Sequence, residues 1–254
     1  MVFAIITAMP TISVLTPTHN RSRSFIESCI RSVSNQQGAS VTQHIVIDNA
    51  STDNTMSHLT GLMSIYPHLV ILHSNENLGP GGALNFALSH VTSDYIWPLD
   101  DDDMLILNGL RVQSDFLNLH PDTDMLIGYA EPIDEMGAVI VGSTISGFNN
   151  MAYDDDNEAF FRAHLAANQL KNGTVIFRTS SVRELGGWHS LNSCQDWELS
   201  LNVLFNNKKH RRNPKIVSRY RIHSHQLSSI NGTNGVWAQK AVDFQLKYGG
   251  RRVS

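Results

Sequence analysis

The sequence predicts an α/β protein with a mostly parallel central sheet flanked by helices. The first hundred residues carry three buried-strand patterns, and an amphipathic helical pattern follows each of them. A fourth apolar strand pattern ends in the four consecutive aspartates 100–103. Strands that alternate with helices form a parallel sheet, because each helix brings the chain back so that the next strand runs in the same direction.

The composition is that of an ordinary globular protein. The chain has 254 residues, a formal charge of -4, 41% apolar residues and 17% charged residues. These values suit one domain over residues 1–254. The basic clusters 208–212 and 251–252 are too short for a nucleic-acid-binding stripe, so we expect no nucleic-acid partner. We expect both clusters to be solvated, with weak peripheral contact to acidic membrane lipid as the alternative.

The sequence predicts no targeting or transmembrane segment. The apolar run 2–6 follows no positive charge and is too short for a signal peptide or a membrane span, so we expect an extra edge strand there. Cys29 and Cys194 are the only cysteines and lie far apart in the chain. They predict no disulfide framework and a reducing, cytoplasmic location.

Three strand–helix units are predicted before the aspartates. The first has a strand at 11–16, a loop at 17–21 and a helix that begins with a capping box of Ser24 and Glu27. The second has a strand at 43–47, a polar turn at 49–55 and a helix with an apolar face at positions 56, 59, 63 and 66. The third has a strand at 69–73 and a helix over 83–88, and the fourth strand spans 95–99.

A glycine-rich loop, 75–82, precedes the third helix. Its glycines suit a nest of backbone N–H groups that binds a phosphate at the helix N-terminus. The alternative is a loop that needs glycine only for its positive φ angles.

The second half of the chain is predicted to be less regular. Helices are expected at 107–119, after the acidic run 153–158, before Gly186 and Gly187, and from Gln195 onward with Trp197 facing inward. Strands are expected at 125–129, 138–141, 173–177 and 216–222. A closing helix carries Trp237, Ala241, Phe244 and Tyr248 as a core-packing stripe.

The loops after residues 16, 47 and 99 are expected to meet in one crevice, because a ligand of an open α/β sheet lies over the carboxyl ends of its strands. Asp48 stands at a strand end and is predicted to contact the ligand there. Asp53 suits either a ligand contact or a cap of the following helix, because aspartate is a common turn and cap residue.

Aspartates 100–103 are the most informative feature of the sequence. Four adjacent carboxylates repel one another, and a divalent cation that shares its oxygen ligands with a phosphate would neutralise them. The alternative is a solvated acidic turn. An EF-hand loop is excluded, because the sixth position from Asp100 is Leu105 instead of glycine and the twelfth is Arg111 instead of glutamate.

Seven motifs in order then carry a resemblance to family 2 glycosyltransferases of the GT-A fold. They are SVLTPTHNR at 13–21, VIDNASTD at 46–53, NLG at 77–79, LDDDD at 99–103, GGW at 186–188, QDWEL at 195–199 and YRIH at 220–223. The resemblance extends from residue 12 to about residue 228.

The resemblance implies transfer of a sugar, with inversion, from a nucleotide-diphosphate donor to a hydroxyl of a glycan, lipid-linked or protein-linked saccharide. The family default donor is a UDP-sugar, residues 10–105 would form the donor half, and residues 106–254 the acceptor half. Mn²⁺ or Mg²⁺ would be the cofactor, with Asp102 as the principal ligand and His223 near the metal or diphosphate. The alternatives are that His225 takes this place or that His223 is an ordinary surface histidine. The donor-binding residues carried over by similarity are Pro17, Thr18, Asn20, Asp48, Asp53, Gly79, Asp100 and Asp101.

Asp196 matches the catalytic base of this family. An inverting displacement is one step, so its base must take the acceptor proton on the face opposite the leaving diphosphate. Without the resemblance, an aspartate here is also explained as a cap or dipole partner of its helix. Many members have Glu-Asp where this chain has Gln195-Asp196, so a charge next to the base is missing. Residues 148–170 and Trp188 are expected to shape the acceptor pocket.

Two other functions remain alternatives. One is a sugar-nucleotide nucleotidyltransferase, although such enzymes open with a glycine-rich, basic loop where this chain has Pro17 and Thr18. The other is a relative that binds nucleotide-sugars without turnover. The intact aspartate cluster argues against this alternative, because clustered charges next to a core lower the stability of the protein and a relative without turnover would have no use for them.

Overall fold

The computed structural model describes residues 9–21, 25–39, 41–142, 157–189, 193–226 and 235–250. Its strands are β1 (Ile12–Thr18), β2 (Gln43–Asn49), β3 (Leu69–Ser74), β4 (Tyr95–Pro98), β5 (Met104–Leu105), β6 (Met125–Ile133), β7 (Val175–Arg178) and β8 (His210–Arg221). Its helices are α1 (Ile26–Ser34), α2 (Thr55–Met63), α3 (Gly79–Leu88), α4 (Gly109–Leu119), α5 (Asn157–Ala166), the 3-10 helix η2 (Asn172–Thr174), α6 (Thr179–Glu184), α7 (Gln195–Phe205) and α9 (Val236–Tyr248).

The strands form one mixed sheet in the order β3-β2-β1-β4-β7-β6-β8-β5. The four strands β3, β2, β1 and β4 are parallel, as predicted. The strand β7 then runs antiparallel to both β4 and β6, while β8 is parallel to β6 and antiparallel to β5. The α/β class is therefore confirmed, and the parallel part of the sheet is concentrated in the first half of the chain.

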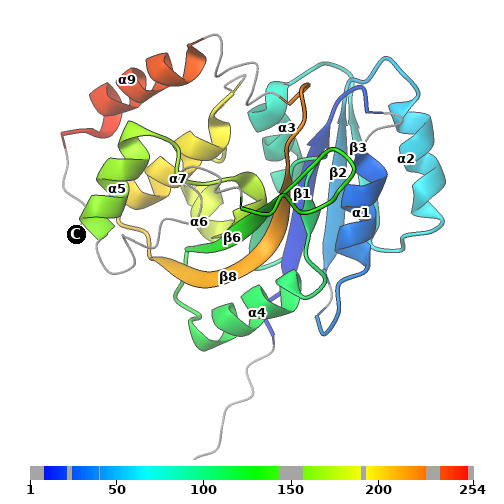
Figure 1. The fold of residues 1–254 in the computed structure, drawn as a ribbon, viewed down its shortest axis with the longest axis horizontal. Coiled ribbons are helices and arrows are strands. Elements are labelled where there is room, and N and C mark those ends of the chain that lie inside the picture. The colour runs from blue at the N-terminus through cyan, green and yellow to red at the C-terminus, as the bar shows by residue number, and fades with distance from the viewer. Residues whose placement is uncertain are drawn as a thin grey trace, which may run out of the picture.

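Helices cover both faces of this sheet (Figure 1). One apolar cluster joins β1 and β2 to α3, α5, α6, α7 and α9 through side chains such as Leu15, Ile47 and Trp197. A second cluster on the opposite face joins β1 and β4 to α1 and α4, and a third packs α2 and α1 against β2. Both faces are therefore buried, which explains the apolar centres of β1, β2 and β4.

The N-terminal elements lie close to their predicted positions. The predicted face of α1 is confirmed, because Ile26, Cys29, Ile30 and Val33 are all buried. In α2 the predicted face is half right: Leu59 is buried and Tyr66 packs against the core, whereas Met56 and Met63 are exposed and Leu62 is buried instead. The proposed Ser24 capping box, the edge strand at 2–6 and most of the acidic run 153–158 lie outside the described residues.

Two predictions about the second half are wrong. Residues 138–141 form no strand, and only Val139 makes an isolated bridge, to Ile133 at the end of β6. The strand β8 begins at His210, six residues before the predicted start at 216. The basic run 208–212 was expected to be solvated. Lys209 is exposed, as expected, and forms an ion pair with Asp122, whereas residues 210–212 are half-buried and pair with β6.

The Gly-Gly-Trp motif joins α3 to the segment before α7. The amide of Asn85, on α3, accepts a hydrogen bond from the Trp188 N–H at 2.8 Å and donates one to the Trp188 carbonyl at 2.6 Å. Gly187 has a φ of +78°, and a Cβ there would lie 2.2 Å from the Asn85 Oδ1 atom. Trp188 is a core residue with 2% exposure, so its predicted place in an acceptor pocket is wrong.

Within the described ranges, none of the helices combines the length and the apolar character needed to span a membrane.

The buried His44 makes folding sensitive to acid. Burial lowers its pKa from 6.5 to about 3, and its Nε2 atom lies 3.0 Å from the Thr16 hydroxyl. As the pH falls below 6.5, the unfolded chain takes up a proton at this position and the folded chain does not, so stability decreases towards pH 3. We expect the wild type to lose about 2 kcal/mol more than His44→Gln between pH 7 and pH 5. Urea unfolding at both pH values measures this difference, and an identical pH dependence of the two proteins would contradict it.

Candidate functional site

A cavity of about 1000 Å³ lies where the carboxyl ends of β1 and β4 meet the N-termini of α3 and α7. Among the residues predicted from the sequence, those that line it are Pro17, Thr18, Gly79, Asp100, Asp101, Asp102, Asp196 and His225. The two acidic segments, which are far apart in the chain, therefore meet in one cavity.

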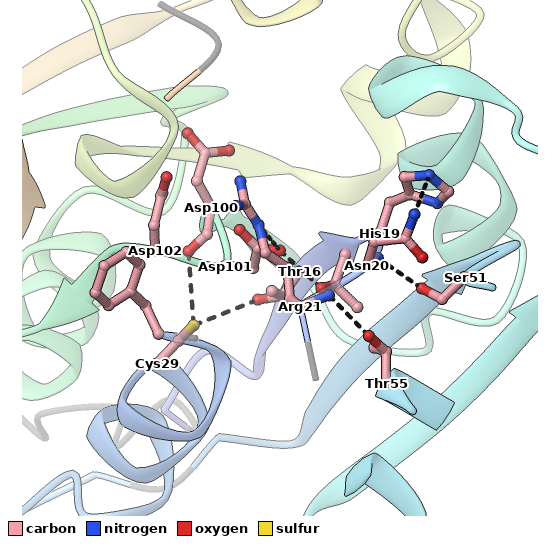
Figure 2. Close-up of polar contacts among 12 residues, drawn as sticks. Thr16, His19, Asn20, Arg21, Cys29, Ser51, Thr55, Asp100, Asp101 and Asp102 are labelled. Carbon is pink, nitrogen blue, oxygen red and sulfur yellow. Dashed lines mark hydrogen bonds and ion pairs between the residues drawn. The ribbon is translucent and has the colours of Figure 1, made fainter. Parts of the chain in front are cut away.

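Three aspartates after β4 are close enough to share one cation. Asp100, Asp102 and Asp103 each offer a carboxylate oxygen, and these atoms all lie within 4.8 Å of one another. Asp101 instead accepts a hydrogen bond from the Thr18 hydroxyl at 2.7 Å and lies 3.4 Å from Arg21. Figure 2 shows Asp101 beside Arg21, and it shows Asp100 and Asp102 nearby.

The cluster is electrostatically strained. Burial, and after it the charge of Asp102, raises the pKa of Asp100 to about 7 and the pKa of Asp101 to about 6. The same two causes raise the pKa of Asp103 well above its usual value. Buried carboxylates that repel one another favour a bound cation, because a cation stabilises their charged forms.

Each member of the cluster is held by a different part of the chain. Asp100 accepts a hydrogen bond from the Asn172 amide of η2 at 2.8 Å. Asp103, to which the sequence assigned no separate role within the cluster, accepts one from the backbone N–H of Arg221 at 2.8 Å.

His223, and not His225, lies beside Asp102. The His223 Nε2 atom is 2.9 Å from the Asp102 Oδ2 atom, and its ring packs against Phe25 with the centroids 5.0 Å apart. The backbone N–H of His225 donates to the His223 Nδ1 atom, so Nε2 carries the proton towards Asp102. The side chain of His225 is exposed in the cavity wall.

The side chains present fit a divalent cation. They supply three carboxylate oxygens that lie within 4.8 Å of one another, and His223 holds one of these carboxylates in place. Hard cations such as Mg²⁺ and Mn²⁺ prefer carboxylate oxygens.

Asp196 is the second residue of α7 and projects into the cavity. The N-cap residue of the helix makes no side-chain cap hydrogen bond, so Asp196 is not a cap, but its place in the first turn fits the other alternative, a partner of the helix dipole. Its Oδ2 atom accepts a hydrogen bond from the Asn168 amide at 3.1 Å. Its charge also contributes to the raised pKa of Asp100, so the two carboxylates face a common space.

Three predicted donor contacts lie outside the cavity wall. Asp48 is fully buried, accepts the Ser51 N–H at 3.3 Å and lies 3.0 Å from the His73 ring. Asp53 accepts hydrogen bonds from both the N–H and the hydroxyl of Thr55, the first residue of α2. This contact with the start of the helix corresponds to the alternative in which Asp53 serves the helix instead of the ligand. Asn20 accepts the Thr52 N–H at 2.8 Å. These contacts shape the loops around the cavity, and a direct role of the three residues in donor binding stays a prediction.

The glycine-rich segment has two separate reasons for its glycines. Gly79 has a φ of +68° and lines the cavity. At Gly81 a Cβ would lie 2.4 Å from the His189 carbonyl oxygen, so this glycine allows the segment before α7 to approach α3. Binding of phosphate here stays a prediction.

Sequence reasoning missed several residues of the cavity wall. They are His19, Asn49, Asn77, Lys171, Asn172 and Tyr220, whereas Asn168 belongs to the segment 148–170 that was expected to shape the acceptor pocket. The asparagines carry no local signal, because an asparagine in a loop is usually a turn residue. Only the antiparallel turn of the chain into β7 brings Asn172 next to Asp100.

This arrangement defines a class of protein. A sheet with a parallel first half, an aspartate cluster after β4 and an opposing carboxylate on a later helix form the GT-A architecture of nucleotide-sugar-dependent glycosyltransferases. The profile of glycosyl transferase family 2 matches residues 13–166, more than half of the chain, and the chain belongs to this family. It is therefore a glycosyltransferase.

Relatives of known sequence carry related names. An uncharacterized glycosyltransferase of Haemophilus influenzae is 27% identical over 230 residues, which cover 87% of this chain and 68% of the relative. A Campylobacter jejuni protein named GalNAc(5)-diNAcBac-PP-undecaprenol beta-1,3-glucosyltransferase is 34% identical over 103 residues, or 40% of this chain and 33% of that protein.

Solved structures confirm the fold. TarS of S. aureus is 19% identical and superposes with a TM-score of 0.68, covering 84% of this chain. The mannosyltransferase PcManGT of Pyrobaculum calidifontis, solved with GDP-Man and Mn²⁺, is 16% identical with a TM-score of 0.69 over 95% of this chain. The chain spans 37% and 65% of the lengths of these two structures, which is less than two thirds of either.

The charge of Asp102 is expected to lower the stability of the metal-free protein. Asp102→Asn removes the charge that raises the pKa of three neighbouring carboxyls, while the amide oxygen can still accept from His223. We expect the free energy of unfolding in a chelating buffer to rise by about 1 kcal/mol. Mn²⁺ should raise the melting temperature of the wild type and not of the variant. The control is Asp115→Asn on the exposed face of α4, and a less stable Asp102→Asn would contradict the prediction.

Proposed function

We propose that the protein is an inverting, metal-dependent glycosyltransferase that moves a sugar from a nucleotide-diphosphate donor to a saccharide hydroxyl in polysaccharide biosynthesis. The observation that carries this proposal is the pair of carboxylate sites, Asp100–Asp102 and Asp196, which face one cavity from different elements. One-step inversion requires two such sites, because the leaving group and the base act on opposite faces of the sugar carbon.

The donor nucleotide is expected at the end of the cavity formed by the loop after β1 and the start of α3. Pro17, Thr18, His19, Asn49 and Gly79 line this end. The diphosphate would then lie beside the aspartate cluster. A UDP-sugar is the proposed donor. TarS has been solved with UDP-GlcNAc and PcManGT with GDP-Man. The identity of the donor's nucleobase is therefore the first property to measure.

Asp102 and Asp100 would hold the metal, with His223 beside Asp102. When bound, Mn²⁺ or Mg²⁺ supplies a Lewis acid that stabilises negative charge on the leaving diphosphate. The other contribution of the chain is rigidity. Asn172 holds Asp100, and His223 holds Asp102, so the carboxylates need little reorganisation when the donor enters.

Asp196 is the proposed base. Asn168 donates to its Oδ2 atom, and among the contacts of the described residues Oδ1 has no partner. Oδ1 would take the proton of the acceptor hydroxyl as the acceptor oxygen bonds to the anomeric carbon. The bond from that carbon to the diphosphate oxygen breaks, and its electron pair leaves with the diphosphate.

Asp196→Asn separates catalysis from donor binding. The amide keeps the size of the side chain and cannot accept the proton, so we expect kcat to fall about 10²–10⁴-fold. The affinity for the nucleotide should change little. Release of nucleoside diphosphate from the sugar nucleotide measures the first quantity, and calorimetry measures the second. Equal and absent turnover in wild type and variant, with intact nucleotide binding, would favour the relative without turnover.

Calorimetric titration with UDP, GDP and dTDP, each with and without Mn²⁺, tests the donor site. We expect one nucleotide to bind in a Mn²⁺-dependent manner and this binding to disappear in Asp102→Ala. Loss of the metal ligand removes the cation that bridges carboxylate and diphosphate oxygens. If none of the three nucleotides binds in either condition, the proposed transfer reaction is excluded.

A further inference from the structure

Asn168 lies in the turn after α5 and faces the proposed base. Its Nδ2 atom donates to the Asp196 Oδ2 atom at 3.1 Å, and its Oδ1 atom accepts the Leu170 N–H at 3.0 Å. A flipped amide would place oxygen against carboxylate and NH₂ against N–H, so the hydrogen bonds determine which end faces Asp196. The turn itself needs only the Oδ1 atom. The NH₂ group is therefore available for Asp196.

A buried histidine ties this turn to α7. The Gln169 N–H donates to the His164 Nδ1 atom at 3.0 Å, and the His164 Nε2 atom is 2.7 Å from the Ser200 hydroxyl. Burial, and after it the neighbouring Arg212 and His210, lowers the pKa of His164 to about 3, so the ring is neutral. Since Nδ1 accepts, Nε2 carries the proton and donates to Ser200.

The connection closes on the residue that carries the proposed base. The Ser200 hydroxyl can donate to the carbonyl of Asp196 or to that of Trp197, each at 2.9 Å. The Trp197 ring N–H also donates to the His164 carbonyl. The turn that carries Asn168 and the first turn of α7 are thus joined at the backbone through His164 and Ser200. The same two turns are also joined by a side-chain contact, the hydrogen bond from Asn168 to Asp196.

We propose that Asn168 is a positioning residue for Asp196 and that the buried His164–Ser200 connection holds Asn168 in place. This inference rests on the proposed function of Asp196. The amide holds Oδ2 and so directs Oδ1 towards the cavity, where the acceptor hydroxyl must arrive. Precise direction matters because a displacement of about 1 Å can reduce the rate about 100-fold.

Asn168→Asp is the discriminating variant. A carboxylate can still accept the Leu170 N–H, so the turn is kept, but it cannot donate to Asp196 and it adds a like charge. We expect kcat to fall about 100-fold, while the KM for the donor and the calorimetric affinity for the nucleotide stay within about twofold. Asn206→Asp, at the far end of α7, is the matched control and should retain the wild-type kcat. A wild-type kcat in Asn168→Asp would show that the residue serves the turn alone and would overturn the proposal.

A second measurement needs no turnover. Asn168→Asp alone should lower the melting temperature by about 3 °C through repulsion from Asp196. Asn168→Asp combined with Asp196→Asn exchanges donor and acceptor, and should restore the wild-type melting temperature without restoring activity. If the double variant is as unstable as Asn168→Asp alone, the two side chains do not interact and the proposal fails. A restored melting temperature with no activity in the wild type would instead support the contact and reject the proposed function.

Ser200→Ala tests the buried connection. It removes the link between His164 and the backbone of α7 and should lower kcat about 10-fold with an unchanged KM for the donor. Combined with Asn168→Asp, its effect should be much smaller than in the wild type, because both changes release the same carboxylate. Fully multiplicative effects on kcat would show that Ser200 acts independently of Asn168 and would overturn this part of the proposal.

Discussion

The structure depends on how four adjacent carboxylates are accommodated after β4. Each of them contacts a different neighbour: Asp100 contacts η2, Asp101 the last residue of β1, Asp102 the segment after β8, and Asp103 the last residue of β8. These contacts reduce the repulsion and leave a group of oxygens in the cavity wall. Elements from both halves of the chain therefore converge on one short turn.

The second half of the chain is mixed for a related reason. Because β7 runs antiparallel to β4, the residues just before it lie beside the aspartates. Because β8 is long and parallel to β6, its end reaches the same place and delivers Arg221 and His223. The segment before α7 is positioned separately, by the two hydrogen bonds between the Asn85 amide and the backbone of Trp188. Only the residues before β7 depend on the antiparallel strand, because a β7 parallel to β4 would place them at the opposite edge of the sheet.

The sequence predicted the parallel half well because its strands are buried on both faces and its helices have clear apolar faces. It failed where the stabilising partner is distant in the chain. The start of β8 contains basic residues that look solvated, yet Arg211 is half-buried, pairs with Leu126 of β6 and forms an ion pair with Asp122. Met63 has the spacing of a core residue, yet α2 turns Leu62 inward instead. Local pattern cannot separate these cases, because both choices fit the same helical or strand period.

The candidate site divides in the same way. The sequence alone determined the aspartate cluster and, through seven motifs in order, the glycosyltransferase class. It pointed to Asp196 through the same resemblance, and the role of Asp196 as a base stays a prediction. Only the tertiary structure decided that His223 and not His225 contacts Asp102, that Asp53 contacts the start of α2, and that Asn168 contacts Asp196. These are contacts between single side chains, and the spatial arrangement of the loops sets them. A linear sequence specifies which groups are available, whereas folding decides which of them lie within hydrogen-bonding distance.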